Sequence, residues 1–145
     1  MRRSFIAVAS LLVLLFAGPA VLRAEESDTA KKLVGTWKLL SAKYGGTESK
    51  LPQEATTLKH ITPSQFQWVT YDGNGKIIRS AGGGYVLQGD DYTETPEYGL
   101  SGDFDVIKGK SHSFKCRIEG NQWHHEGKLD NGLTIDEVWE RVEKK

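Results

Sequence analysis

Turn-forming residues interrupt this chain at short intervals from Leu33 to its end. Glycine, asparagine and aspartate adopt positive φ angles or turn dihedrals at little energetic cost. The turn clusters are Gly45-Gly46, Thr62-Pro63-Ser64, Asp72-Gly73-Asn74-Gly75, Gly89-Asp90, Gly99 to Gly102, Lys108-Gly109-Lys110, Gly120-Asn121 and Asp130-Asn131-Gly132. No segment between them shows a long apolar period of 3.6 residues. The spacing therefore favours short strands joined by tight turns.

The segments between the turns are rich in β-branched and aromatic residues, which favour strands. We expect strands at 34–44, 56–62, 65–71, 76–81, 84–88, 91–97, 103–108, 112–119, 122–129 and 133–143. Such a series, without the spacing of parallel βαβ units, predicts an all-β domain that is an up-and-down antiparallel barrel or a sandwich. The run Gly82-Gly83-Gly84 indicates either a bulge where the sheet bends or a flexible loop.

The first residues have the layout of a secretory signal peptide. Two arginines precede an apolar run at 5–16, and small residues offer cleavage sites at Ala20 or Ala24. The run is twelve residues long, whereas a membrane-spanning helix needs about 20. We therefore expect export to the periplasm or the medium, with an uncleaved anchor as the alternative. The expected organisation is a signal peptide at 1–24, a polar lead-in at 25–32 and one domain at 33–145.

Charge and cysteine content exclude further classes. Loss of Arg2, Arg3 and Arg23 with the leader reduces the 19 basic residues to 16, against 19 acidic residues. Because the basic residues are also dispersed, nucleic-acid binding is not expected. The one cysteine, Cys116, cannot form an intrachain disulfide, so stability must come from a core. Strand alternation places its side chain beside that of Phe114, which predicts a buried, unreactive thiol.

Alternation along the expected strands also gives one face that collects all four tryptophans together with polar side chains. The candidate ligand-binding residues on this inward face are His60, Phe66, Trp68, Arg79, Tyr85, Tyr92, Glu94, His112, Phe114, Trp123, His125, Glu137 and Trp139. Six of them are histidine, arginine or glutamate, which are costly to bury in a dry core without partners. A water-containing, aromatic-lined cavity resolves this conflict, and small β-barrels can enclose one.

Two segments at the ends of the domain resemble a known superfamily. Gly35-Thr36-Trp37-Lys38-Leu39 resembles the first strand of the calycins, the lipocalins and fatty-acid-binding proteins, whose G-x-W motif opens the barrel. The segment 137–142 resembles their last strand. The resemblance implies that Trp37 packs across the closed end of the barrel and that Arg141 lies against it as a cation–π pair.

The order of motifs along the mature chain is similar to that of bacterial secreted lipocalin-like domains of unknown function. The shared segments are 35–39, Phe66-Gln67-Trp68, 83–87, 91–94 and 131–141. This resemblance implies a single up-and-down antiparallel β-barrel and an exported location, and it implies no particular chemistry.

One departure from the fatty-acid binders bears on the ligand. Those proteins place an Arg-x-Tyr pair inside the barrel to hold a carboxylate, and this chain has Glu137 and Trp139 at the equivalent positions. An acid at that depth disfavours an anionic head group. We therefore expect a small hydrophobic or amphipathic ligand that is neutral or hydroxylated and partly apolar, rather than a plain fatty acid.

Enzyme chemistry finds little support in the sequence. His60, His112 and His125 with Glu94 and Glu137 supply the donor types of a zinc or iron site, but their spacing matches no metal motif. No nucleophile elbow and no phosphate-binding glycine loop occurs. We therefore predict no catalytic residue, no metal, no cofactor and no membrane span after processing. Two alternatives to ligand binding stay open: a cell-envelope module that binds protein or glycan, and a small barrel enzyme.

Overall fold

The computed structural model describes residues 27–49, 54–100 and 102–143, so the expected signal peptide at 1–24 lies outside the described residues. The elements are α1 (Asp28–Leu33), β1 (Gly35–Tyr44), β2 (Thr47–Glu48), β3 (Thr56–Ile61), β4 (Gln65–Tyr71), β5 (Ile77–Gln88), β6 (Asp91–Gly99), α2 (Asp103–Ile107), β7 (His112–Glu119), β8 (Gln122–Lys128) and β9 (Thr134–Arg141). Neither helix of this part of the chain is long and apolar enough to cross a membrane.

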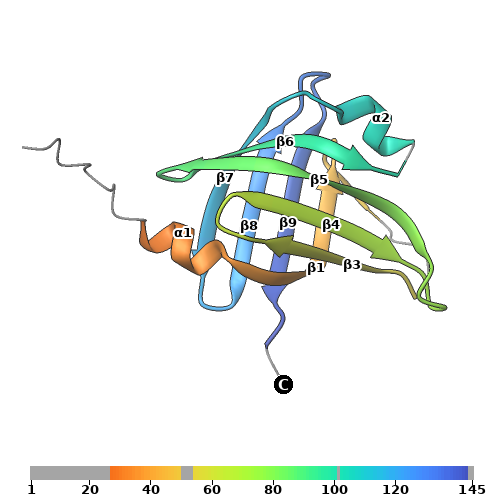
Figure 1. Ribbon diagram of the computed structural model, residues 1–145, viewed down its shortest axis with the longest axis horizontal. Helices are drawn as coiled ribbons and strands as arrows, with labels where there is room; N and C mark the ends of the chain where they lie inside the picture. The colour runs from red at the N-terminus through yellow and green to blue at the C-terminus, as the bar shows by residue number, and fades with distance from the viewer. Residues whose placement is uncertain (1–26, 50–53, 101, 144–145) are drawn as a thin grey trace, which may run out of the picture.

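The strands form one antiparallel sheet that closes on itself (Figure 1). Each strand from β3 to β9 pairs with the next along the chain, and β1 pairs with both β3 and β9. Closure therefore involves eight strands, while the two-residue β2 pairs only with the end of β1. The prediction of an up-and-down antiparallel barrel is confirmed, and the sandwich alternative is wrong.

The glycine run lies inside one long strand. β5 covers both segments that were expected as separate strands, and its pairing with β6 shifts register between Gly82 and Gly83. A Cβ atom at Gly83 would overlap the carbonyl group of Thr95, so only glycine fits there. The run is thus the predicted bulge and not the alternative loop.

The expected strand at 103–108 is wrong, because this segment forms the short helix α2. The side chain of Asp105 accepts a hydrogen bond of 2.8 Å from the backbone N–H of Gly102, which precedes the helix. Gly102 has a φ of 100°, a value that favours glycine. Alternation of Phe104 and Val106 with polar residues suggested a strand, but only Phe104 is buried.

The two helices lie at opposite ends of the barrel (Figure 1). Leu33 of α1 belongs to a cluster of buried apolar side chains in the interior of the barrel. The other members of this core cluster are Trp37, Leu39, Ala42, Ile61, Phe66, Tyr92, Phe114, Cys116, Trp123 and Trp139. α2 lies at the end where the β8–β9 turn projects (Figure 1), and it contacts β5 and β6. The α1 end of the barrel is therefore packed, whereas the α2 end borders the cavity that the next subsection describes.

Candidate functional site

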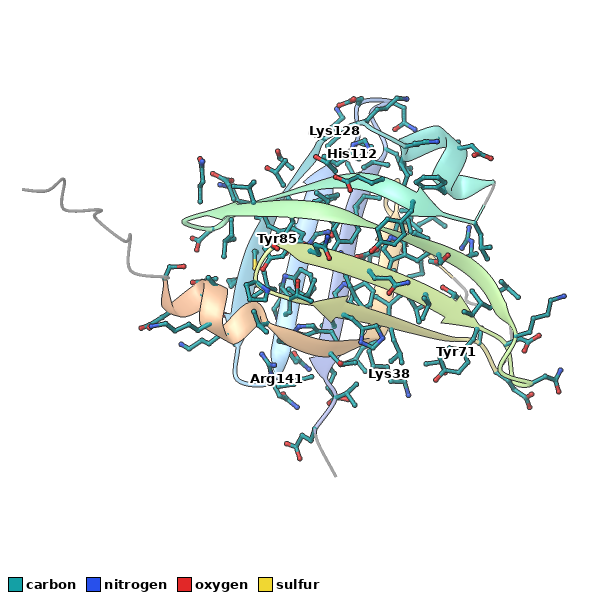
Figure 2. All side chains as sticks on the ribbon, viewed as in Figure 1. Lys38, Tyr71, Tyr85, His112, Lys128 and Arg141 are labelled. Atoms are coloured by element: carbon teal, nitrogen blue, oxygen red, sulfur yellow. The ribbon has the colours of Figure 1, made fainter. Side chains whose placement is uncertain are left out.

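A cavity of about 320 Å³ lies inside the barrel and extends to its α2 end. Its apolar wall includes Leu39, Trp68, Phe114, Leu129, Ile135 and Trp139, and its polar side chains include Lys59, Glu94, His112, His125 and Glu137. Val106 of α2 and Leu133 of the β8–β9 turn also line it and are exposed, which places them at the mouth. His112 lies toward this end of the barrel and Arg141 toward the other (Figure 2).

Eight of the thirteen predicted ligand-binding residues line this cavity: Trp68, Arg79, Glu94, His112, Phe114, His125, Glu137 and Trp139. They come from β4, β5, β6, β7, β8 and β9, so strands that are distant in sequence contribute to one wall. Arg79 is exposed and therefore lies at the rim.

The predicted inward position of His60 is wrong. The ring of His60 is exposed, and its Nδ1 atom lies 3.1 Å from the hydroxyl oxygen of Thr36 on the neighbouring strand. The preceding residue, Lys59, is buried instead, with 2% of its surface exposed. Ile61 gives the signal that could have set the correct alternation, because it is the strongly apolar residue next to the turn and is buried on the same face as Lys59.

The other four predicted residues lie in or beside the core and not on the cavity wall. Phe66, Tyr92 and Trp123 are core members. Tyr85 is half-buried, packs 4.9 Å from the ring of Tyr92, and donates a hydrogen bond of 2.7 Å to the carbonyl of Thr62. The rings of Tyr92 and Trp123 pack against that of His125, which lines the cavity.

Lys59 is the cavity residue that the sequence interpretation missed. Its ammonium group forms an ion pair with the Glu94 carboxylate, and both side chains are almost completely buried. The nitrogen also lies 5.0–5.5 Å from the ring centroids of four aromatic residues, Phe66, Tyr92, Trp123 and Trp139. Aromatic faces attract a desolvated cation. The rings and Glu94 together compensate the buried charge of Lys59.

Glu137 lies in the wall with both carboxylate oxygens occupied. One oxygen accepts a hydrogen bond of 2.8 Å from the hydroxyl of Tyr44, and the other accepts one of 3.0 Å from the indole N–H of Trp139. Burial raises the pKa of Glu137, and the charge of Glu94 adds to this, while Lys59 and the two donors oppose it. The protein itself therefore satisfies this carboxyl group.

Two histidines of the wall have unsatisfied ring nitrogens. Within the described part of the chain, neither nitrogen of His112 has a hydrogen-bond partner, and neither does Nδ1 of His125. The ring of His125 packs against that of Phe114, with 4.0 Å between centroids. Burial, aided by the charge of Lys59, lowers the pKa of His125 well below its usual value, so its ring is neutral at pH 7. No group of three or more potential metal ligands occurs among the described residues.

Comparison with known proteins places the fold. No family model and no curated protein matches the chain. A solved lipocalin-like protein from Bacteroides uniformis ATCC 8492 superposes with a TM-score of 0.53 at 15% identity, covering 76% of this chain and 98% of that protein. A redesigned β-barrel superposes with a TM-score of 0.52 at 15% identity, covering 79% and 96% of the two chains. The chain therefore has the fold of a lipocalin-like protein, a closed up-and-down barrel of eight strands.

Proposed function

We propose that the protein is an exported binder of a small, neutral or hydroxylated, partly apolar ligand, which it holds in the barrel cavity. The cavity carries this proposal, because its volume of about 320 Å³ and its apolar wall with a few converging polar groups are typical of small-molecule sites. Export rests on the leader-like sequence at 1–24.

The charges in the wall favour a neutral ligand. Lys59 and Glu94 neutralise each other, and the carboxyl group of Glu137 already accepts two hydrogen bonds from the protein. An ionic head group at this depth would lose its hydration and gain no unpaired counter-charge from these three residues. Arg79 also lines the cavity, but it is exposed and lies at the rim.

The position of the tryptophans favours this function over a cell-envelope module. An interaction surface would be expected to show a large exposed aromatic patch. Here Trp37, Trp123 and Trp139 are buried and Trp68 is half-buried in the cavity wall. The exposed large apolar residues of the described chain include no tryptophan.

Titration with N-phenyl-1-naphthylamine, an uncharged fluorescent probe, tests the binding function. We expect saturable binding with micromolar affinity, and quenching of tryptophan emission. Trp68→Ala should weaken binding by about tenfold, because an aromatic wall of the site is lost. Its neighbour Gln67 points outward and is exposed, so Gln67→Ala is the matched control and should bind as the wild type does. Absence of saturable binding to the folded protein would contradict the proposal.

Intact-mass measurement on protein secreted by a bacterial host tests export. We expect a mature chain that begins near Glu25, since the apolar run is short and small residues follow it. Recovery of the exported protein with its first residues attached would contradict the assignment of a cleaved leader.

A further inference from the structure

We propose that His112 and His125 form a hydrogen-bonding subsite in the cavity that selects a hydroxylated aromatic compound, a phenol, over the same ring system without a hydroxyl group. This inference rests on the proposed function, because it assigns the chemistry of the ligand in that cavity. Three observations carry it: two buried imidazoles without sufficient partners, a neutral local charge balance, and flat rings around them.

The two histidines lie on adjacent strands with Phe114 between them. His112 and Phe114 are two residues apart on β7 and both point inward. His125 lies on β8 and pairs with Cys116, which is two residues beyond Phe114 on β7. His112 and His125 are 5% and 2% exposed, and both side chains line the cavity. The subsite is therefore part of one continuous wall formed by β7 and β8.

The free nitrogens indicate that something else completes this wall. A buried donor or acceptor without a partner costs about 1–3 kcal/mol, and folded proteins rarely tolerate one. His112 has two such nitrogens and His125 has one, counted over the residues that the structure describes. Both histidine side chains line the cavity, so a small molecule inside it lies against their rings. A polar group of the bound molecule would supply a partner that the protein itself does not provide at this wall.

A hydroxyl group fits this subsite better than a charged group. A neutral imidazole has one donor and one acceptor, and a hydroxyl group can both donate and accept. A carboxylate only accepts, and its charge would lie in a wall that already holds Glu94 and Glu137. An ammonium group only donates, and it would share the cavity with the ammonium group of Lys59. The Glu94 carboxylate already pairs with Lys59 and is not free to pair with a second cation. A hydroxyl group can hydrogen-bond to an imidazole of this wall without introducing a new buried charge.

The surrounding rings favour an aromatic body for the same molecule. The planes of the Phe114 and His125 rings make an angle of 30°, and 4.0 Å separates their centroids. The two rings therefore form a roughly stacked pair. The indoles of Trp68 and Trp139 line the cavity as well. Flat aromatic rings stack on or pack edge-on against such walls with a gain beyond area burial. A phenol combines this flat body with the required hydroxyl group.

Matched probes test the inference by calorimetry: 2-naphthol, naphthalene, and the carboxylate 2-naphthoate. We expect the wild-type protein to bind 2-naphthol at least about tenfold more tightly than naphthalene, the gain from well-formed hydrogen bonds. His112→Phe should keep naphthalene binding and lose most of the preference for 2-naphthol. His124→Phe is the control, because His124 is on β8 but on the opposite face from His125, and it should preserve the preference.

A measurement on the wild-type protein guards against a variant that does not fold. Histidine side-chain NMR spectra should show 2-naphthol shifting the imidazole nitrogen resonances of His112 and His125 more than naphthalene does. Equal affinity for 2-naphthol and naphthalene, or tightest binding of 2-naphthoate, would overturn the subsite and leave cavity binding standing. Failure of all three compounds and of the neutral fluorescent probe to bind would overturn both the subsite and the proposed function.

Discussion

The guanidinium carbon of Arg141 lies 4.1 Å from the centroid of the Trp37 indole, across the β1–β9 pairing that closes the barrel. The indole N–H of Trp37 donates a hydrogen bond of 2.8 Å to the carbonyl of Leu33 in α1. The guanidinium group donates to the carbonyls of Val34 and Lys32. The expected cation–π pair is confirmed, and it also fastens the N-terminal helix to the closing strands.

A double-mutant cycle measures the strength of this pair. Trp37→Ala removes a fully buried indole and should lower the free energy of unfolding by about 3–5 kcal/mol. Arg141→Ala should cost about 1–2 kcal/mol, because a cation–π contact and the packing of the side-chain stem are lost. Chemical denaturation of both single variants and the double variant should give a total smaller than the sum of the singles. Strict additivity would show that the two side chains do not interact.

The glycine of the G-x-W motif is required by the same contact. Gly35 has a φ of 145°, and a Cβ atom there would lie 2.5 Å from Nη1 of Arg141. Gly35→Ala should therefore destabilise the protein by about 1–3 kcal/mol through backbone strain and displacement of the guanidinium group. Gly46 also has a positive φ, but a Cβ atom there would meet nothing within 4 Å. Gly46→Ala is therefore the control. If thermal unfolding shows an equal loss of stability for both variants, backbone strain alone explains the loss and the contact with Arg141 adds nothing.

The closed end could be predicted because the segments 35–39 and 137–142 resemble the first and last strands of a known barrel superfamily. The inward set of β7 could be predicted too, since His112, Phe114 and Cys116 alternate with polar residues and are all buried. β3 gives only a weak signal, because its two strongly apolar residues, Leu58 and Ile61, lie on opposite faces of the strand. The residue that it buries is Lys59, whose charge is compensated by Glu94 and by four rings from other strands. Those contacts depend on closure of the barrel, so the local sequence does not contain them.

The ion pair inside the barrel is expected to respond differently to single and double replacement. Lys59→Met leaves the Glu94 carboxylate buried alone and should lower the free energy of unfolding by about 3–5 kcal/mol. Adding Glu94→Leu should recover much of that loss, because apolar residues of similar size can replace a buried pair. Urea denaturation of the single and double variants gives both values.

An exposed ion pair provides the control for this experiment. Lys115 and Asp91 lie 2.5 Å apart on the surface, and both side chains are more than half exposed. Lys115→Met should leave the free energy of unfolding nearly unchanged, because solvent screens such pairs. A similar loss from Lys59→Met and Lys115→Met would contradict the role assigned to burial.

Cys116 is expected to be unreactive in the folded protein. Burial raises the pKa of its thiol to about 11, so only about one thiol in a thousand is ionised at pH 8. A thiol-specific chromogenic reagent should react with one thiol per chain in denaturant and only slowly under native conditions. The native rate should follow local or global opening of the barrel. Rapid reaction of the folded protein would contradict a buried thiol.

His125 should make the protein less stable as the pH falls below neutrality. Burial and Lys59 lower the pKa of His125 well below its usual value, which is about 6.5. As the pH falls through 6.5, the unfolded chain takes up a proton at this residue and the folded protein does not. The free energy of unfolding therefore decreases, with a slope that approaches about 1.4 kcal/mol per pH unit from this group. Above pH 6.5 neither state binds the proton, so this contribution is constant.

His125→Phe removes this group, and His124→Phe serves as control. Denaturation at pH 7.5 and 5.5 should show a smaller loss of stability for His125→Phe than for the wild type or the control, whereas parallel losses in all three proteins would show that His125 is protonated in the folded barrel.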